Sequence, residues 1–120
     1  MTKEDLQECA AFCNEADALA GILAELERRR GSPGWTEFAE LAYGCRVRFY
    51  RRFLERVEKQ LQEVSEALNK LPSNERQLLI LRYFCGYSWQ KIAQELGYSE
   101  DNVRGYLHRK ALEHLQVNTS

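Results

Sequence analysis

Apolar residues between Tyr43 and Leu71 recur at alternating spacings of four and three, and this regularity restricts the fold more than any other feature of the chain. The series consists of Tyr43, Val47, Tyr50, Leu54, Val57, Leu61, Val64, Leu68 and Leu71. Such spacing keeps all these side chains on one face of an α-helix and is typical of a coiled-coil seam. A helix from Thr36 to Leu68 would extend roughly 50 Å. Because that is too long for burial inside one small domain, we expect part of it to pack on a separate partner.

The preceding residues predict another helix that folds back on the long one. The stretch from Lys3 to Arg30 has no proline, and its apolar residues also recur at spacings of three and four. These residues are Leu6, Cys9, Cys13, Ala16, Ala20 and Leu23. Gly31-Ser32-Pro33-Gly34 then breaks the helix, and Thr36 can cap the next one. We therefore expect residues 1–70 to form a helical hairpin, with helices at about 3–30 and 36–69.

The long helix carries a second apolar stripe beside the seam. Its members are Phe38, Leu41, Ala42, Cys45, Phe49 and Phe53. Two stripes on one helix imply two partners. The folded-back helix is one expected partner, and the other is either a second copy of the chain or the C-terminal module. Of these we favour a homodimer through the long helix, which makes residues 1–70 a dimerisation arm.

Residues 71–120 predict a module of three short helices separated by glycine. The first helix opens at Pro72-Ser73-Asn74-Glu75 and closes at Gly86. Ser88 can cap the second helix, which Gly97 ends. No segment alternates polar and apolar residues as a strand would. The predicted fold is all-α: an N-terminal helical hairpin or coiled-coil arm, followed by this three-helix module.

The last two helices meet the steric requirements of a helix-turn-helix unit. Ala93 supplies the small side chain needed where the helices cross, and Gly97 accepts the positive φ of the turn. Ser99 caps the second helix. Apolar residues fill the positions expected to face the core, namely Ile92, Leu96, Tyr98, Val103 and Tyr106. The short turn sets the second helix across the first, so that its N-terminal half can project into a major groove.

Several short motifs follow one another within these helices. They are Leu71-Pro72 followed by Glu75-Arg76, Leu81 to Tyr83, Ile92-Ala93, Leu96-Gly97, and Val103 to Arg109. As an ensemble they resemble region four of bacterial sigma factors, especially that of extracytoplasmic-function sigma factors and of small phage regulators of the ArpU type. The resemblance covers about 45 residues, which end at Leu115. Residues 1–70 lack the promoter-melting pattern of sigma region two, so promoter melting is not expected.

The resemblance implies a sequence-specific transcription regulator, of phage or bacterial type, that binds double-stranded DNA and acts with RNA polymerase. The residues that it places toward base edges are Asn102, Arg104, Gly105 and His108. Those that we assign to the DNA backbone are Ser88, Gln90, Lys91, Ser99, Arg109 and Lys110. The chemistry agrees, because arginine can bond both guanine acceptors and asparagine can bond adenine in the same way. Exposed parts of Leu78, Tyr83 and Phe84 are the expected polymerase contacts.

The charge distribution keeps other functions open. The formal net charge is −1, and residues 61–120 hold seven basic and seven acidic groups. A DNA-binding module normally shows a basic excess, and Glu100 and Asp101 in the last helix would repel phosphates. One alternative is an adaptor that mimics region four and binds polymerase or a sigma antagonist without DNA. A weaker one is a DNA recogniser for phage packaging.

The sequence favours neither enzymatic chemistry nor a membrane protein. It contains no Gly-rich phosphate loop, no metal-ligand cluster and no nucleophile with a neighbouring base, so we expect no catalytic residues, metal or cofactor. Cys9 and Cys13 fit core packing better than metal binding. No apolar run reaches the roughly 20 residues that span a bilayer. With four cysteines and no leader-like segment, the reducing cytoplasm is the expected setting.

Overall fold

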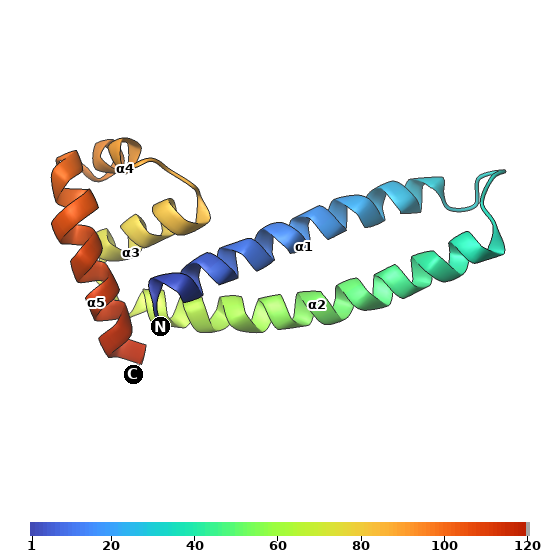
Figure 1. Ribbon diagram of the computed structural model, residues 1–120, viewed down its shortest axis with the longest axis horizontal. Coiled ribbons are helices and arrows are strands. Elements are labelled where there is room, and N and C mark those ends of the chain that lie inside the picture. The colour runs from blue at the N-terminus through green and yellow to red at the C-terminus, as the bar shows by residue number, and fades with distance from the viewer. Residues whose placement is uncertain (120) are drawn as a thin grey trace. The chain divides into compact units, whose positions relative to one another are not determined.

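The computed structural model describes residues 1–119, and every regular element in that range is helical (Figure 1). The elements are α1 (Lys3–Arg29), α2 (Glu37–Asn69), α3 (Ser73–Leu79), η1 (Ile80–Phe84), α4 (Trp89–Leu96), η2 (Asn102–Leu107) and α5 (His108–Thr119). The two η elements are π-helical turns with wider hydrogen-bonded rings than an α-helix. The predicted all-α fold, with long N-terminal helices before a helix-turn-helix part, is confirmed. Within the described range, no helix is both long and apolar enough to cross a bilayer.

Contacts divide the chain into two compact units. The hairpin unit comprises Ala11–Gln60, and the composite unit comprises Met1–Ala10 together with the residues from Leu61 onward. The boundary thus differs from the one that we expected after residue 70. The first turns of α1 and the last turns of α2 belong with the C-terminal helices, where Leu6 and Val64 are almost completely buried.

In the hairpin unit, α1 and α2 run antiparallel and are joined by a short turn (Figure 1). Gly31 in this turn has a φ of 79°, a conformation that glycine adopts without penalty. Thr36 caps α2, because its Oγ1 accepts a hydrogen bond from the Ala39 N–H at 3.0 Å. Glu40 binds Arg30 and accepts a 2.7 Å hydrogen bond from the Trp35 indole N–H. These contacts hold the ends of the two helices together.

The apolar seam expected on α2 packs, in the hairpin unit, against α1 of the same chain. Its residues Tyr43, Val47, Tyr50 and Leu54 are half-buried, and Val57 is buried. Phe53, which belongs to the second stripe, also contacts α1, because its ring meets the Phe12 ring edge-on with ring centroids 6.0 Å apart. The folded-back helix is therefore one of the two partners that the stripes of α2 imply.

The composite unit encloses an apolar core to which α1, α2, α3, α4, η2 and α5 contribute buried side chains. Its fully buried side chains are Leu6, Cys9, Leu78, Leu79, Ile92, Val103, Ala111 and Leu115. Along the last helix the buried residues recur strictly every four positions, from Val103 through Leu107 and Ala111 to Leu115. A π turn holds more residues than an α turn, so η2 favours the first of these steps, from Val103 to Leu107, and the later steps lie in α5.

Candidate nucleic-acid interface

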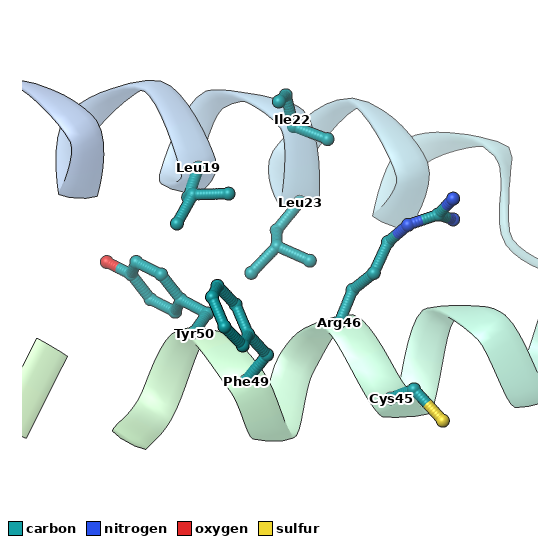
Figure 2. A pocket seen from close by; sticks show the side chains of 7 residues that line it. All are labelled: Leu19, Ile22, Leu23, Cys45, Arg46, Phe49 and Tyr50. Carbon is teal, nitrogen blue, oxygen red and sulfur yellow. The ribbon is translucent and has the colours of Figure 1, made fainter. Parts of the chain in front are cut away.

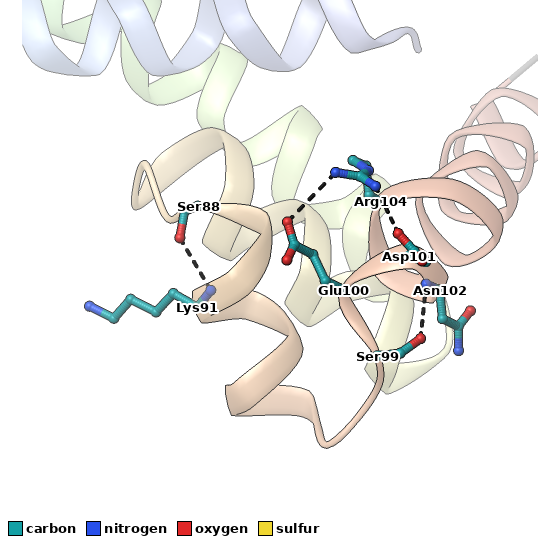
Figure 3. Close-up of polar contacts among 7 residues, drawn as sticks. All are labelled: Ser88, Lys91, Ser99, Glu100, Asp101, Asn102 and Arg104. Carbon is teal, nitrogen blue, oxygen red and sulfur yellow. Dashed lines mark hydrogen bonds and ion pairs between the residues drawn. The ribbon is translucent and has the colours of Figure 1, made fainter.

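Local hydrogen bonds define both helices of the helix-turn-helix and the turn between them (Figure 3). Ser88 starts α4, because its Oγ accepts a 3.2 Å hydrogen bond from the Lys91 N–H. Gly97 ends α4 with a φ of 77°, and its N–H donates to the Ala93 carbonyl at 2.9 Å. Ser99 Oγ then accepts a 3.2 Å hydrogen bond from the Asn102 N–H. The residues from Glu100 to Thr119 form one continuous helix that includes η2, which we call the recognition helix.

Of the residues expected to face the core of this motif, most are buried or half-buried and two are exposed. Ile92, Ala93 and Val103 are buried, and Leu96 is half-buried. Tyr106, however, is 56% exposed, and Leu107 takes the inward position.

The physical reason for this correction to the position of Tyr106 is the π turn. In an α-helix the residues three and four positions after Val103 would both lie near the inward face. In the wider turn of η2 only the fourth residue returns to that face, and the third falls outside. Tyr98, another expected core residue, is also partly exposed, at 41%.

Tyr106 is a candidate site residue that sequence reasoning missed. The Arg109 guanidinium carbon lies 5.8 Å from the centroid of its ring, and Lys110 Nζ lies 6.0 Å from it. Arg109 is exposed and Lys110 is half-buried, and Lys110 also pairs with Glu113 at 3.6 Å. The spacings of three and four from Tyr106 to the two cations are the signal that could have found this cluster.

Arg104 is exposed on the recognition helix but is held by two acids of the same helix (Figure 3). Its Nη2 lies 2.8 Å from Asp101 Oδ1, and its Nη1 lies 3.6 Å from Glu100 Oε1. Exposed ion pairs are worth about 0–1 kcal/mol, so another acceptor can displace them. The pairs also offset the negative charge that Glu100 and Asp101 bring to this surface.

Asn102 and Gly105 flank Arg104 on the recognition helix. The Asn102 side chain is half-buried and points away from the Arg104 ion pairs (Figure 3). Gly105 is exposed, and a Cβ built there meets no atom within 4 Å. The start of the recognition helix therefore presents polar groups together with a backbone that another molecule can approach closely.

His108 does not match its expected place among the base-reading residues. Its Nε2 lies 2.7 Å from Tyr83 Oη, and its ring meets the Trp89 ring at a centroid distance of 4.8 Å. Burial, with smaller contributions from Lys3 and Arg82, lowers the pKa of His108. Burial raises the pKa of Tyr83. The imidazole is thereby favoured in its neutral form, and the half-buried pair joins η1 to the recognition helix.

The expected backbone contacts at the start of α4 lie on the surface. Ser88, Gln90 and Lys91 are exposed, and Lys91 Nζ lies 3.9 Å from the centroid of the Tyr87 ring. Ser88 and Ser99 use their oxygens to cap helices, which leaves each hydroxyl hydrogen available to a phosphate.

An apolar groove lies elsewhere in the composite unit, between the end of α2 and η1. It has a volume of about 230 Å³. Its apolar lining consists of Leu61, Val64, Leu68, Ile80 and Phe84. Of the expected polymerase contacts, only Phe84 lines this groove. Leu78 is completely buried, and Tyr83 is hydrogen-bonded to His108, so the expectation of exposed contacts at Leu78 was wrong.

Comparison with known families finds a match for this part of the chain. Residues 61–115 match the family model described as Sigma-70, region 4. The match begins where α2 enters the composite unit and runs through α3, α4 and most of the recognition helix. This segment, just under half of the chain, is a region-4-like helix-turn-helix. Comparison with curated proteins and with solved structures returned no match.

Proposed function

We propose that the chain is a sequence-specific DNA-binding transcription regulator that acts with RNA polymerase. The observation that carries the proposal is the exposed start of the recognition helix, set across α4 by the turn at Gly97. In helix-turn-helix proteins, side chains at this position reach base edges in the major groove. The match of residues 61–115 to sigma-70 region 4 supports the same role. The resemblance to ArpU-type regulators adds the narrower proposal that the regulator is of phage type.

In this proposal Arg104 and Asn102 read bases, and Gly105 lets the helix backbone approach them. Arg104 exchanges Asp101 for the two acceptors of a guanine, at the small cost of an exposed ion pair. Tyr106, Arg109 and Lys110 lie further along the helix and contact the sugar-phosphate backbone together with Ser88, Gln90, Lys91 and Ser99. His108 supports the helix through Tyr83 rather than reading a base.

The balanced charge of the C-terminal half limits the affinity of one copy for DNA. Residues 61–120 carry no net basic excess, and phosphate neutralisation supplies much of the affinity of a DNA-binding protein. A homodimer through α2 is therefore part of the proposal, because two copies would engage two half-sites at once.

The test is a binding measurement on specific and unrelated duplexes with two arginine variants. Arg104→Ala should weaken specific binding by about 1–3 kcal/mol and change non-specific binding little. Arg109→Ala is the matched control and should weaken both kinds of binding equally, because a phosphate contact carries no sequence information. Equal losses on both duplexes for Arg104→Ala would contradict base reading.

A protein adaptor is the second candidate, and the groove at Leu61, Ile80 and Phe84 favours it. An apolar interface at this groove would respond little to salt, whereas DNA binding through several phosphates weakens steeply as salt rises. Purified polymerase is the probe for this candidate. The adaptor is favoured over the DNA-binding regulator if the chain binds polymerase without salt dependence, if Phe84→Ala abolishes this binding, and if no DNA binding is measurable.

A further inference from the structure

The hairpin unit exposes an apolar surface on α2 and the neighbouring part of α1. Phe38 is 78% exposed, Leu41 70%, Phe49 62% and Ile22 53%. Cys45 is also exposed, and it lies between Leu41 and Phe49 on the same face of α2. We call these five residues the apolar stripe.

A shallow groove accompanies the stripe. Leu19 and Leu23 of α1 point toward Phe49 and Tyr50 of α2 (Figure 2). The groove has a volume of about 300 Å³, and Ile22, Cys45 and Arg46 complete its lining. Protruding side chains next to a groove allow the surface to fit a copy of itself.

The size of the stripe agrees with a dimer interface. A large aromatic side chain has about 150–250 Å² of surface that burial can remove, so the four exposed fractions given above correspond to on the order of 500 Å² in total. The largest apolar patches on monomers reach about 300–600 Å² and are often functional. Two copies joined through the stripe would bury roughly 1,000 Å² in total, which is near the threshold for a specific interface and within the range of weak, reversible association.

We propose that a second copy of this chain covers the stripe, with the two α2 helices antiparallel about a two-fold axis near Cys45. Leu41 and Phe49 lie at equal separations on either side of Cys45 along the chain. An antiparallel pair centred at Cys45 therefore sets Leu41 of each copy against Phe49 of the other. Both copies use the same surface, as a two-fold interface requires.

Charge favours the antiparallel arrangement over the parallel one. Glu37 lies in the first turn of α2, and Arg52 is exposed beyond the other end of the stripe. The antiparallel pair brings Glu37 of one copy close to Arg52 of the other. In a parallel pair, Arg52 of one copy would lie against Arg52 of the other. Like charges in contact disfavour association.

This inference rests on the homodimer through α2 in the proposed function, and the first experiment measures the oligomeric state of the full chain without DNA, so its result does not depend on DNA binding. Sedimentation velocity in reducing buffer should show a reversible dimer that forms as concentration rises. Leu41→Glu and Phe49→Glu should each weaken dimerisation at least about tenfold. Leu61→Glu is the matched control: the same change on the same helix, at a 41% exposed site outside the stripe.

Circular dichroism of each variant checks that the helices remain folded. The interface is supported if the Leu61→Glu variant dimerises as strongly as the unchanged chain while the two stripe variants lose dimerisation. A chain that stays monomeric at all concentrations overturns it, as does an equal loss in the Leu61→Glu variant.

The second experiment tests the orientation of the two copies. Glu37→Arg should weaken the dimer several-fold, and the added change Arg52→Glu should restore it, because the pair is exchanged between copies. No recovery in the double variant would overturn the antiparallel arrangement. In a Cys85→Ser background, which removes the other exposed thiol, a short bis-maleimide should link two copies through Cys45, and failure to form this covalent dimer would contradict the position of the axis.

Discussion

The Tyr83 hydroxyl lies 2.7 Å from Nε2 of His108, and this hydrogen bond joins the two π-helical regions of the composite unit. Tyr83 belongs to η1, and His108 follows η2 directly. Trp89, the first residue of α4, contacts the same imidazole. The position of the recognition helix therefore depends on η1 and on the start of α4, as well as on its own turn at Gly97. π turns often occur at functional sites, and here η2 determines which face of the recognition helix is exposed.

The lowered pKa of His108 makes the composite unit sensitive to acid. The unfolded chain takes up the proton near the ordinary pKa of 6.5, and the folded chain does so only at lower pH. The contribution of His108 to the free energy of unfolding is therefore complete above pH 6.5. It is lost as the pH drops from 6.5 through the pKa that His108 has in the folded chain. Urea denaturation at pH 7.5 and pH 5.5 measures the loss. His108→Gln should show a smaller loss between the two pH values, and an unchanged loss would contradict the assignment to His108.

Two exposed glycines of the helix-turn-helix should respond to alanine in opposite directions. Gly97→Ala should destabilise the fold by about 1–2 kcal/mol, because the residue has a φ of 77°. The added methyl meets no atom within 4 Å, so backbone strain is the only cause. Gly105→Ala lies within a helix without positive φ and should stabilise by about 0.5–1 kcal/mol. Thermal denaturation of both variants checks the signs, and a loss of stability in both would contradict the geometry.

Gly105→Ala also separates stability from DNA binding. If the helix backbone approaches base edges at Gly105, the added methyl weakens specific DNA binding although the fold is more stable. Anisotropy titration of the variant against specific DNA measures this effect. Unchanged affinity would place the helix backbone at Gly105 away from the bases.

Tyr106 and its neighbour Leu107 should behave as a surface residue and a core residue. Tyr106→Ala should change the free energy of unfolding by less than about 0.5 kcal/mol. Leu107→Ala should cost about 2–5 kcal/mol, because Leu107 is only 6% exposed. Chemical denaturation of the two variants gives the comparison. A large loss of stability in Tyr106→Ala and a small one in Leu107→Ala would instead place Tyr106 in the core, as α-helical spacing predicts.

Features that depend on neighbouring residues were readable from the sequence. Ser88, Gly97 and Ser99 occupy the capping positions that their side chains or backbone freedom indicate. The hairpin followed from apolar spacing, and the ion pairs of Arg104 were within reach of the same reasoning. Glu100 and Asp101 precede Arg104 by four and three residues, the separations at which helical side chains meet.

Features that depend on packing between distant segments were not readable in this way. The inward position of Leu107 results from a π turn, which local propensity does not distinguish from an α turn. The half-burial of His108 depends on Tyr83, 25 residues earlier. Leu6 and Cys9 join a core whose other members lie beyond residue 60, a pairing that helical periodicity cannot indicate.

The acids beside Arg104 should limit affinity for DNA of any sequence. Asp101→Asn removes one negative charge from the surface, so it should strengthen binding to specific and unrelated duplexes alike, by severalfold at low salt. Glu63→Gln is the control, because it removes the same charge from an exposed site on α2 outside the helix-turn-helix. An equal gain in both variants would show that net charge alone, and not the position of Asp101, is responsible.

The most direct test of the account is selection of duplex DNA from a random pool by the purified full chain. The account predicts enrichment of a short motif containing a guanine whose selection disappears when Arg104 is replaced by alanine, while the rest of the motif persists. Failure of the unchanged chain to enrich any motif over the starting pool would contradict sequence-specific DNA binding by the recognition helix.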